Sequence, residues 1–229
     1  MKQVLITGAN GNLGAVTVKK FLDSGYRVIA VARSGSNLGF ASGNKYFELH
    51  QVDLLKKEQV DAFAEKAIHL YGSIEGALFL AGGFEMGDIA HTTDVNIAEM
   101  FAKNFETAFH ISGLFFRHML QYDYGRMVFI GAKAGLDGRQ AKGAVAYGLS
   151  KSLLFHYAET LNAAATGKNV TASVVVPGTI DTLPNRQAMP DADFSKWVKP
   201  EAIADLLEYI CSDRSNALRE PVYKIYGEG

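Results

Sequence analysis

Short, continuously apolar runs alternate along this chain with longer stretches of helical character, and this alternation is the feature that most constrains its fold. The apolar runs are residues 4–6, 28–31, 46–52, 77–80, 127–130, 170–176 and 222–225. Such runs suit strands of a parallel sheet that is covered on both faces. The helical stretches are residues 14–24, 56–71, 96–120, 147–165 and 200–211. The order predicts right-handed βαβ units in one doubly wound α/β domain over residues 1–229, with a seven-stranded, mostly parallel sheet and helices on both faces.

One stretch between the predicted elements is long and irregular. It covers residues 179–199 and contains Pro184 and Pro190, with Asn185 and Asp191 beside them. A loop of this length in a compact domain is usually a lid or a binding loop. We therefore expect residues 179–199 to contact a substrate.

Composition and charge exclude several classes of function. The net charge is −1, from 23 basic and 24 acidic residues, and no Lys/Arg-rich run is present, which argues against binding to nucleic acid or to an anionic membrane. The chain contains no stretch of about 18 apolar residues, the length that is needed to span a bilayer. The single cysteine, Cys211, excludes an internal disulfide and a multi-cysteine metal site and fits a reducing compartment. We expect a cytoplasmic protein that acts on a small-molecule substrate and holds no metal.

Glycines gather directly after the first apolar run. The segment from Thr7 to Gly14 reads Thr-Gly-Ala-Asn-Gly-Asn-Leu-Gly and leads into the first helical stretch. A strand, a tight glycine turn and a helix N-terminus in this order let the backbone approach a pyrophosphate, whose charge is met by free N–H groups and the helix dipole. The alternative is a glycine-rich connection without a ligand. The position at the first βα turn favours dinucleotide binding. The residues expected to bind it are Gly8, Asn10, Gly11, Asn12, Leu13 and Gly14.

The ends of the second and third predicted strands bear on the choice of dinucleotide. The second ends in Val31-Ala32-Arg33-Ser34, without a carboxylate that would bind the ribose hydroxyls. Because a guanidinium can pair with a 2′-phosphate, Arg33 and Ser34 favour NADP(H) over NAD(H), although an arginine at a strand end can also be simply solvated. After the third strand, Asp53, followed by Leu54, could receive the adenine amino group or cap the next helix.

A tyrosine and a lysine open the helical stretch 147–165. Tyr147 and Lys151 are four residues apart and share one face of a helix. An ammonium close to a phenol lowers the phenol pKa from about 10, which would make Tyr147 an acid or base near neutrality. Pairs with this spacing are common on helix surfaces without a chemical role. This pair, however, follows a nucleotide-binding turn and precedes Pro177-Gly178-Thr179-Ile180-Asp181-Thr182.

Taken together, these motifs resemble the short-chain dehydrogenase/reductase family over the whole chain. The resemblance implies a Rossmann fold, with Tyr147 as the proton donor and Lys151 lowering its pKa and holding the nicotinamide ribose. Asn104 matches the asparagine that supports the family's proton-relay water, unless it is an incidental residue within a helix. Besides the glycine-rich turn, the cofactor-binding positions that the resemblance implies are Ala81, Gly82, Gly83, Tyr147, Lys151, Pro177, Gly178, Ile180 and Thr182.

The chain departs from the family pattern after the fifth strand. The family carries a Ser-Ser pair there, whereas this chain reads Ile130-Gly131-Ala132-Lys133. Ala132 stands where the catalytic serine would polarise a substrate carbonyl, and Ser150 and Ser152 lie on the helix, on the wrong side to replace it. An ordinary alcohol dehydrogenase is therefore disfavoured.

A subgroup of the family shares this departure. Segments 81–83, 131–138 and 181–186, followed by 189–197, resemble quinonoid dihydropteridine reductase. That subgroup also lacks the serine, keeps the tyrosine and lysine, and reduces an electron-poor ring that needs less carbonyl polarisation. It differs in carrying an acidic residue for NADH where this chain has Ala32 and Arg33. The residues expected to line the substrate pocket are Phe84, Ala132, Met189, Phe194 and Trp197.

The leading hypothesis is an NAD(P)H-dependent reductase of a quinonoid dihydropterin-like or other conjugated small molecule. One alternative is a carbonyl or quinone reductase that acts through Tyr147 and Lys151. Another is a non-catalytic regulator that senses NADP(H), which the missing serine favours and the retained Tyr147, Lys151 and Asn104 disfavour. The helical stretches 96–120 and 147–165 are apolar on more than one face, which predicts a homodimer or homotetramer through them, unless the sheet and neighbouring helices cover both faces.

Overall fold

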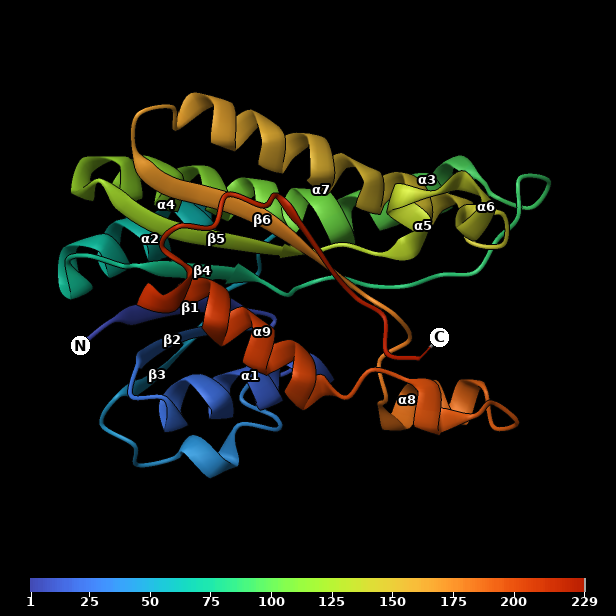
Figure 1. The fold of residues 1–229 in the computed structure, drawn as a ribbon, viewed down its shortest axis with the longest axis horizontal. Coiled ribbons are helices and arrows are strands. Elements are labelled where there is room, and N and C mark those ends of the chain that lie inside the picture. Colours follow the sequence, from blue (N-terminus) through green and yellow to red (C-terminus); the bar gives the residue numbers. More distant parts are fainter. Residues whose placement is uncertain (229) are drawn as a thin grey trace.

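Seven strands form one sheet in the order β3-β2-β1-β4-β5-β6-β7, and every neighbouring pair is parallel (Figure 1). The strands are β1 (Gln3–Thr7), β2 (Arg27–Ala32), β3 (Phe47–Gln51), β4 (Gly76–Phe79), β5 (Tyr124–Ile130), β6 (Asn169–Pro177) and β7 (Val222–Ile225). This computed structural model describes residues 1–228. The predicted seven-stranded sheet is confirmed, since each apolar run coincides with a strand.

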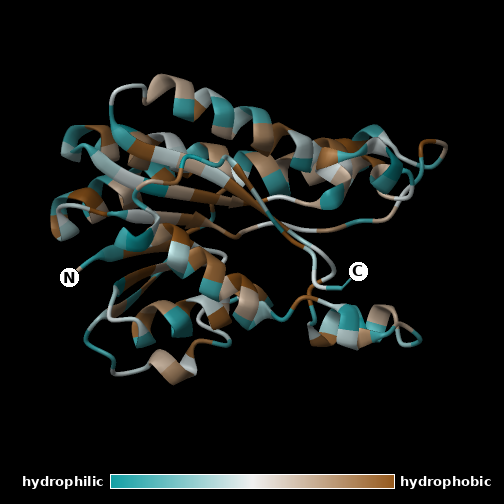
Figure 2. Cartoon of the chain, viewed as in Figure 1, coloured by the Kyte–Doolittle hydropathy of each residue, from teal (hydrophilic) through white to brown (hydrophobic). Residues whose placement is uncertain are grey.

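Helices cover both faces of this sheet (Figure 1). The helices on one face are α1 (Asn12–Asp23) and α9 (Pro200–Cys211), and those on the other are α2 (Lys57–Tyr71), α4 (Thr107–Tyr122) and α7 (Val145–Ala164). Leu5 packs in the core under the second group and Ile6 in the core under the first, because successive strand residues point to opposite faces. Figure 2 shows hydrophobic residues along the strands and on the helix faces toward them. Burial on both faces explains why the apolar runs are continuous.

The direction in which the chain builds the sheet reverses at β1, whose neighbours are β2 and β4. In open parallel sheets, ligands bind beyond the carboxyl ends of the strands at such a reversal. The glycine-rich turn follows β1 directly, so the fold sets that turn at the reversal point.

The helical stretch predicted at residues 96–120 is two α-helices joined by a π-helical turn. The first, α3 (Asp94–Phe101), begins with a capping box in which the side chains of Thr93 and Asn96 bond to each other's backbone N–H groups. The π-helical turn, η2 (Ala102–Glu106), continues directly into α4. Turns of this kind inside α-helices are frequent at functional sites. This one contains Asn104.

The segment 179–199 contains more regular structure than the sequence suggests. It holds helix α8 (Leu183–Ala188) and the 3-10 turn η3 (Phe194–Lys196), so the expectation of irregular backbone is wrong there. Pro184 lies in the first turn of α8, where the missing N–H of proline breaks no helical bond. A parallel bridge between Ile180 and Val198 holds the two ends of the segment together. Figure 1 shows α8 beyond the carboxyl end of the sheet, on the side of α1 and α9.

Four further short elements have no counterpart in the sequence prediction. They are the helices α5 (Lys133–Leu136) and α6 (Gly138–Ala141) and the 3-10 turns η1 (Gly39–Ala41) and η4 (Asp213–Ser215). Helix α5 packs tightly on α7, because a Cβ on Gly135 would lie 2.9 Å from the Lys151 carbonyl carbon and one on Gly148 would lie 3.0 Å from the Ala134 oxygen. Glycines at these two positions therefore permit the contact.

Among residues 1–228, no helix has both the length and the apolar character needed to cross a membrane. Over the same residues, no three His, Cys, Asp or Glu side chains gather in a way that could hold a metal ion.

Candidate functional site

The turn between β1 and α1 is built from glycines that have no room for side chains. Gly8 has a φ of +62°, and a Cβ there would lie 2.7 Å from the Ala81 nitrogen. A Cβ on Gly14 would lie 2.1 Å from the Gly8 oxygen, and the Gly11 N–H donates to that same oxygen at 3.0 Å. The turn is therefore packed against the end of β4 and against itself.

The N-terminus of α1 is open toward the cavity. Gly11 caps the helix without a side chain, Asn12 and Leu13 open the first turn, and that turn contains no acidic residue. The first N–H groups of a helix have no partner within it, and the helix dipole is positive there. This end can accept an anion such as a pyrophosphate.

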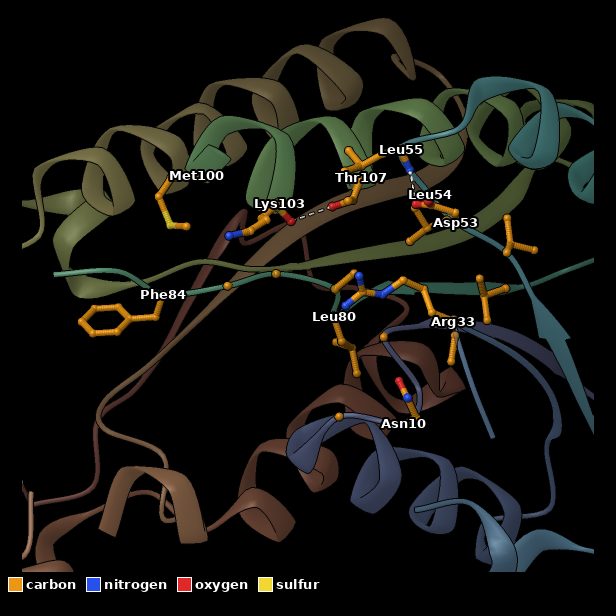
Figure 3. A pocket seen from close by; sticks show the side chains of 18 residues that line it. Asn10, Arg33, Asp53, Leu54, Leu55, Leu80, Phe84, Met100, Lys103 and Thr107 are labelled. Carbon is orange, nitrogen blue, oxygen red and sulfur yellow. Dashed lines mark hydrogen bonds between the residues drawn. The ribbon is translucent and has the colours of Figure 1, made fainter. Parts of the chain in front are cut away.

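A cavity of about 530 Å³ lies at the carboxyl ends of β1, β2 and β4 (Figure 3). The residues predicted from sequence that line it are Gly8, Asn10, Gly11, Arg33, Asp53, Leu54, Ala81, Gly82, Gly83 and Phe84. The lining residues not predicted are Val31, Ala32, Val52, Leu55, Leu80, Met100, Lys103 and Thr107. A sequence signal for Lys103 and Thr107 exists, since they are four residues apart, beside Asn104, and share one face of a helix.

A polar corner surrounds the end of β2. The Asn10 amide donates to the Ser34 hydroxyl at 3.0 Å and to the Ser36 hydroxyl at 3.3 Å, and the Asn37 amide donates to the Asn10 carbonyl at 3.1 Å. Arg33 lies beside them on the cavity wall. Sequence reasoning found Asn10, Arg33 and Ser34 and missed Ser36 and Asn37, which the polar run after Arg33 could have indicated. Donors and a cation gather here without a carboxylate among these five residues.

Asp53 closes a turn rather than capping a helix. Its carboxylate accepts from the Leu55 N–H at 3.2 Å, while α2 begins later, at Lys57, with Lys56 as the cap. The cap alternative is therefore wrong. Asp53 lines the cavity, which leaves it available to a nucleotide.

Asn104, Lys151 and Gly82 converge beside the cavity. The Asn104 side chain, buried, accepts from the Gly83 N–H at 2.9 Å and donates to the Ser150 hydroxyl at 3.1 Å. A Cβ on Gly82 would lie 2.7 Å from the Asn104 oxygen and 3.4 Å from the Lys151 ammonium. The π-helical turn, the end of β4 and α7 thus meet at Gly82. Asn104 is thus buried, and both the oxygen and the nitrogen of its amide are engaged.

The Tyr147 and Lys151 side chains share a face but do not touch through their polar atoms. The Lys151 ammonium donates to the Ile130 carbonyl at 2.8 Å and lies 5.9 Å from the centre of the Tyr147 ring. Within residues 1–228 the phenol oxygen makes no hydrogen bond to protein, and the Phe84 ring packs edge-on against the Tyr147 ring with centroids 4.9 Å apart. The phenol is therefore covered on one side by an aromatic wall.

Burial sets the pKa values of this pair. It raises the pKa of Tyr147 to about 12 and lowers that of Lys151 to about 8. The expectation that the ammonium lowers the phenol pKa is wrong for the protein alone, because the ammonium is directed at Ile130. Tyr147 is thus a protonated phenol near neutrality, and Lys151 titrates much closer to neutrality than an ordinary lysine.

The loop after Gly83 is tied to the start of α7. The Gly87 N–H donates to the Gly143 carbonyl at 2.9 Å, and the Val145 N–H donates to the Gly87 carbonyl at 2.8 Å. These two bonds form a bridge just before Tyr147 in the chain. They fix the loop that carries Phe84 relative to the phenol.

Neither Ala132 nor the nearby Ser150 and Ser152 offers a free hydroxyl at the end of β5. Ala132 is buried and precedes α5. The Ser150 hydroxyl donates to the Tyr147 carbonyl at 2.8 Å, and the Ser152 hydroxyl donates to the Leu149 carbonyl at 2.7 Å. Both serine hydroxyls are thus committed to helix α7 itself.

The residues expected at the nicotinamide end lie outside the cavity lining. Pro177 ends β6, and the Gly178 N–H donates to the Ile225 carbonyl at 2.8 Å. A Cβ on Gly178 would lie 2.6 Å from the Tyr226 oxygen. Ile180 pairs with Val198, and the Thr182 side chain caps α8. Gly178 thus allows the chain that leaves β6 to lie directly against the segment that follows β7.

The expected substrate pocket is only partly brought together. Phe84 lines the cavity, whereas Ala132, Met189, Phe194 and Trp197 do not. Phe194 and Trp197 pack on each other, with ring centroids 4.8 Å apart, and Met189 is 41% exposed. The segment 179–199 therefore carries an aromatic cluster that stands apart from the cavity wall.

Comparison with known proteins decides the family. The family described as short chain dehydrogenase matches residues 2–193 of this chain. The chain belongs to the short-chain dehydrogenase family. It is 30% identical to the 3-oxoacyl-(acyl-carrier-protein) reductase MabA of Mycobacterium tuberculosis, over 99% of this chain and 92% of that protein. It is 26% identical to an uncharacterized oxidoreductase, YvrD, of Bacillus subtilis, over 99% and 95%.

A solved structure shares the fold. It is described as a 4-hydroxyisoleucine dehydrogenase complexed with NADH, and it superposes with a TM-score of 0.89 at 21% identity, over 99% of this chain and 98% of that one. This likeness confirms the single-domain Rossmann fold predicted from the strand and helix order.

Membership of the short-chain dehydrogenase family makes this chain an oxidoreductase that uses a nicotinamide dinucleotide, NAD or NADP. The site fits that cofactor. A bare glycine turn and an uncapped helix N-terminus face a cavity of about 530 Å³, and Arg33 supplies a cation at its edge. Gly8, Gly11 and the first turn of α1 would hold the pyrophosphate, and Asp53, Leu54 and Ala81 would face the adenine.

Proposed function

We propose that this member of the short-chain dehydrogenase family is an NADPH-dependent reductase of a planar, conjugated small molecule such as a quinonoid dihydropterin. The observation that carries the proposal is a combination of residues: Tyr147, Lys151 and Asn104 are present, while Ala132, directly after β5, offers no hydroxyl to polarise a carbonyl. An electron-poor ring accepts hydride without that polarisation. A substrate of this class therefore needs the proton donor that the chain has and does not need the hydroxyl that it lacks at position 132.

A bound reduced nicotinamide supplies the hydride. Tyr147 donates the proton that balances the added charge, since its phenol is protonated at neutral pH and has no protein partner among residues 1–228. Lys151, held by the Ile130 carbonyl, would turn toward the nicotinamide ribose and lower the phenol pKa from that position. Asn104 positions the backbone at Gly83 and supports the path by which Tyr147 regains its proton.

The corner at the end of β2 supports NADP(H) over NAD(H). Arg33 and the hydroxyls of Ser34 and Ser36 offer a cation and donors to a 2′-phosphate, and the corner lacks the carboxylate that would repel it. A preference for NADP(H) would distinguish this chain from quinonoid dihydropteridine reductases, which carry an acidic residue for NADH at this position.

We assign the substrate side of the site to Phe84 and to the segment 179–199. Phe84 packs on Tyr147, so a flat ring lying against Phe84 would bring its edge to the phenol. Met189, Phe194 and Trp197 would close over the opposite side of the ring, and Ala132 would leave space for it. The segment would have to move inward to do so, since these side chains do not line the cavity.

Reduction of a ketone or quinone is the second candidate. Its support is the similarity to 3-oxoacyl reductases, proteins whose names state a ketone substrate. The two candidates differ in their need for a hydroxyl at position 132. Ala132→Ser should raise ketone reduction by about 100-fold if a serine is the missing donor, and should leave reduction of a conjugated ring unchanged.

The exposed apolar residues of α3, α4 and α7 support a homodimer or homotetramer. Val95, Phe109 and Leu149 are 65%, 49% and 56% exposed on these helices. Burial against a second subunit would remove them from water.

The single, buried cysteine supports a reducing, cytoplasmic location.

A cofactor-oxidation screen tests the proposed function. Purified protein is incubated with NADPH or NADH and with quinonoid dihydropterin, a quinone or a 3-oxoacyl thioester. We expect NADPH to be oxidised fastest with quinonoid dihydropterin. Tyr147→Phe should abolish turnover but keep NADPH binding. The matched control is Tyr157→Phe on the same helix, which removes only a bond to the Ser112 hydroxyl. Turnover that survives Tyr147→Phe, or activity confined to the thioester, would contradict the proposal.

A further inference from the structure

We propose that Lys103 binds a phosphate group of the dinucleotide by exchanging its partner Glu99 for that phosphate. The inference deepens the proposed function, on which it rests only in that a nucleotide occupies the cavity. Three residues with formal charge line the cavity: Arg33, Asp53 and Lys103. Arg33 and Asp53 have assigned roles at the adenosine end, whereas Lys103 has none.

Lys103 faces the glycine-rich turn across the cavity. It belongs to the π-helical turn, next to Asn104, whose side chain is fixed by Gly83 and Ser150. Figure 3 shows Lys103 on the wall formed by this turn and Asn10 on the opposite wall, after β1. A nucleotide that lies on the glycine-rich turn therefore has the Lys103 side chain on its other side.

Gly83 allows the Lys103 side chain to lie along the cavity wall. A Cβ on Gly83 would lie 3.1 Å from Lys103 Cδ, closer than most Cβ contacts. The bare backbone at Gly83 thus gives the alkyl chain a surface to rest on. Since Asn104 holds the Gly83 N–H at 2.9 Å, that surface is fixed.

The partner of Lys103 is outside the cavity. The Lys103 ammonium lies 2.7 Å from a Glu99 carboxylate oxygen, and the two side chains are 48% and 52% exposed. Glu99 is not among the residues that line the cavity. An exposed pair of this spacing stabilises a helix only slightly, so its loss costs little. A phosphate offers more charge and more acceptor oxygens to the same ammonium.

The cavity has the charge that this exchange requires. Arg33 and Lys103 contribute two positive charges, and the one negative charge, on Asp53, is engaged by the Leu55 N–H. The α1 N-terminus adds its partial positive charge on the same side as the glycine-rich turn. A polyanionic dinucleotide is therefore attracted from both walls.

Titration calorimetry with ADP-ribose tests the inference for the pyrophosphate, because this probe carries the two pyrophosphate groups but no 2′-phosphate, nicotinamide or substrate. Lys103→Met should raise the Kd about fivefold and make it less sensitive to salt, which a merely structural role would not do. Glu99→Gln should lower the Kd, because it frees the ammonium. In the Lys103→Met background, Glu99→Gln should have no effect.

The control uses a matched pair away from the cavity. Lys19 and Asp23 form an exposed pair of the same spacing at 2.6 Å on α1, and Lys19→Met should leave the Kd unchanged. An unchanged Kd in Lys103→Met, or a Glu99→Gln effect that persists without Lys103, would overturn the inference alone. A wild-type protein that binds neither ADP-ribose nor NADPH would overturn the proposed function and this inference with it.

Discussion

Replacing Lys151 by methionine should change how the stability of the protein depends on pH. The Lys151 side chain is buried, with 5% of the residue exposed, and burial lowers its pKa from 10.5 to about 8. Methionine has a similar length and carries no charge. The substitution therefore removes the buried ammonium and leaves an ordinary apolar side chain in its place.

The sign of the effect follows from the two pKa values. Between pH 8 and 10.5 the unfolded chain holds a proton on Lys151 that the folded chain has lost, so folding becomes more favourable as pH rises. The full effect is about 3 kcal/mol, and about 2 kcal/mol of it falls between roughly pH 7 and pH 9.5. Near pH 7, where both states are protonated, the wild type carries the whole cost of the buried charge.

Lys151→Met should therefore be at least as stable as the wild type near neutrality. The relief of about 3 kcal/mol matches or exceeds the loss of one hydrogen bond to the Ile130 carbonyl, which costs about 1 to 3 kcal/mol when the acceptor stays buried. At higher pH the order reverses, because the wild type gains stability that the variant cannot. The variant should also lack reductase activity at every pH.

Urea unfolding followed by circular dichroism measures this difference. Wild type and variant are compared from pH 7 to pH 9.5 at one protein concentration without nucleotide, and Lys57→Met, at an exposed lysine, serves as the control. Over this pH range the free energy of unfolding of the wild type should rise by about 2 kcal/mol relative to that of Lys151→Met. Relative to that of Lys57→Met it should not change. A stability difference that stays constant, or that moves in favour of the variant as pH rises, would refute the assigned burial of the charge.

Three further changes have expected outcomes. Arg33→Ala should raise the KM for NADPH about tenfold and leave that for NADH unchanged in steady-state assays; equal effects on both would contradict a 2′-phosphate contact. Gly14→Ala should weaken nucleotide binding at least tenfold, roughly, because its Cβ would lie 2.1 Å from the Gly8 oxygen, while Gly113→Ala, which meets nothing within 4 Å, should bind normally in the same titration. Asp181→Asn, which weakens the ion pairs to Arg186 and Lys199, should speed proteolysis of the segment 179–199 and raise the KM for substrate without changing the Kd for NADPH; an unchanged cleavage rate would count against an anchoring role.

The strands were predictable because a sheet covered on both faces imposes one local rule on each of them. Leu5 and Ile6 go to opposite cores, yet both must be apolar, so the run is continuous whichever face each residue takes. The glycine-rich turn was predictable for a similar reason, since Gly8 and Gly14 have no room for a side chain. Constraints of this kind restrict the residue type at single positions and can therefore be recognised in the sequence.

The parts that escaped prediction depend on contacts between distant segments. The π-helical turn around Asn104 looks like ordinary helix in sequence, and only its packing against Gly83 and Ser150 distinguishes it. The raised pKa of Tyr147 could not be predicted from the sequence for the same reason. Helical spacing puts Lys151 on the correct face but does not reveal that its ammonium is directed at the Ile130 carbonyl, 21 residues away in the chain. Pro184 looks like a helix breaker in sequence, although it stands in the first turn of α8.

The bridge between Gly87 and the segment before α7 fixes the distance between Phe84 and the Tyr147 phenol. The Val145 N–H that bonds to Gly87 lies two residues before Tyr147, so the wall formed by Phe84 is tied to the start of the helix that carries the phenol. Sequence changes between Glu85 and the bridge, or beyond it toward α3, would reshape the wall while the two hydrogen bonds keep its distance from the phenol. Under the proposed function, the surface offered to a substrate could therefore change without a change in the position of the proton donor.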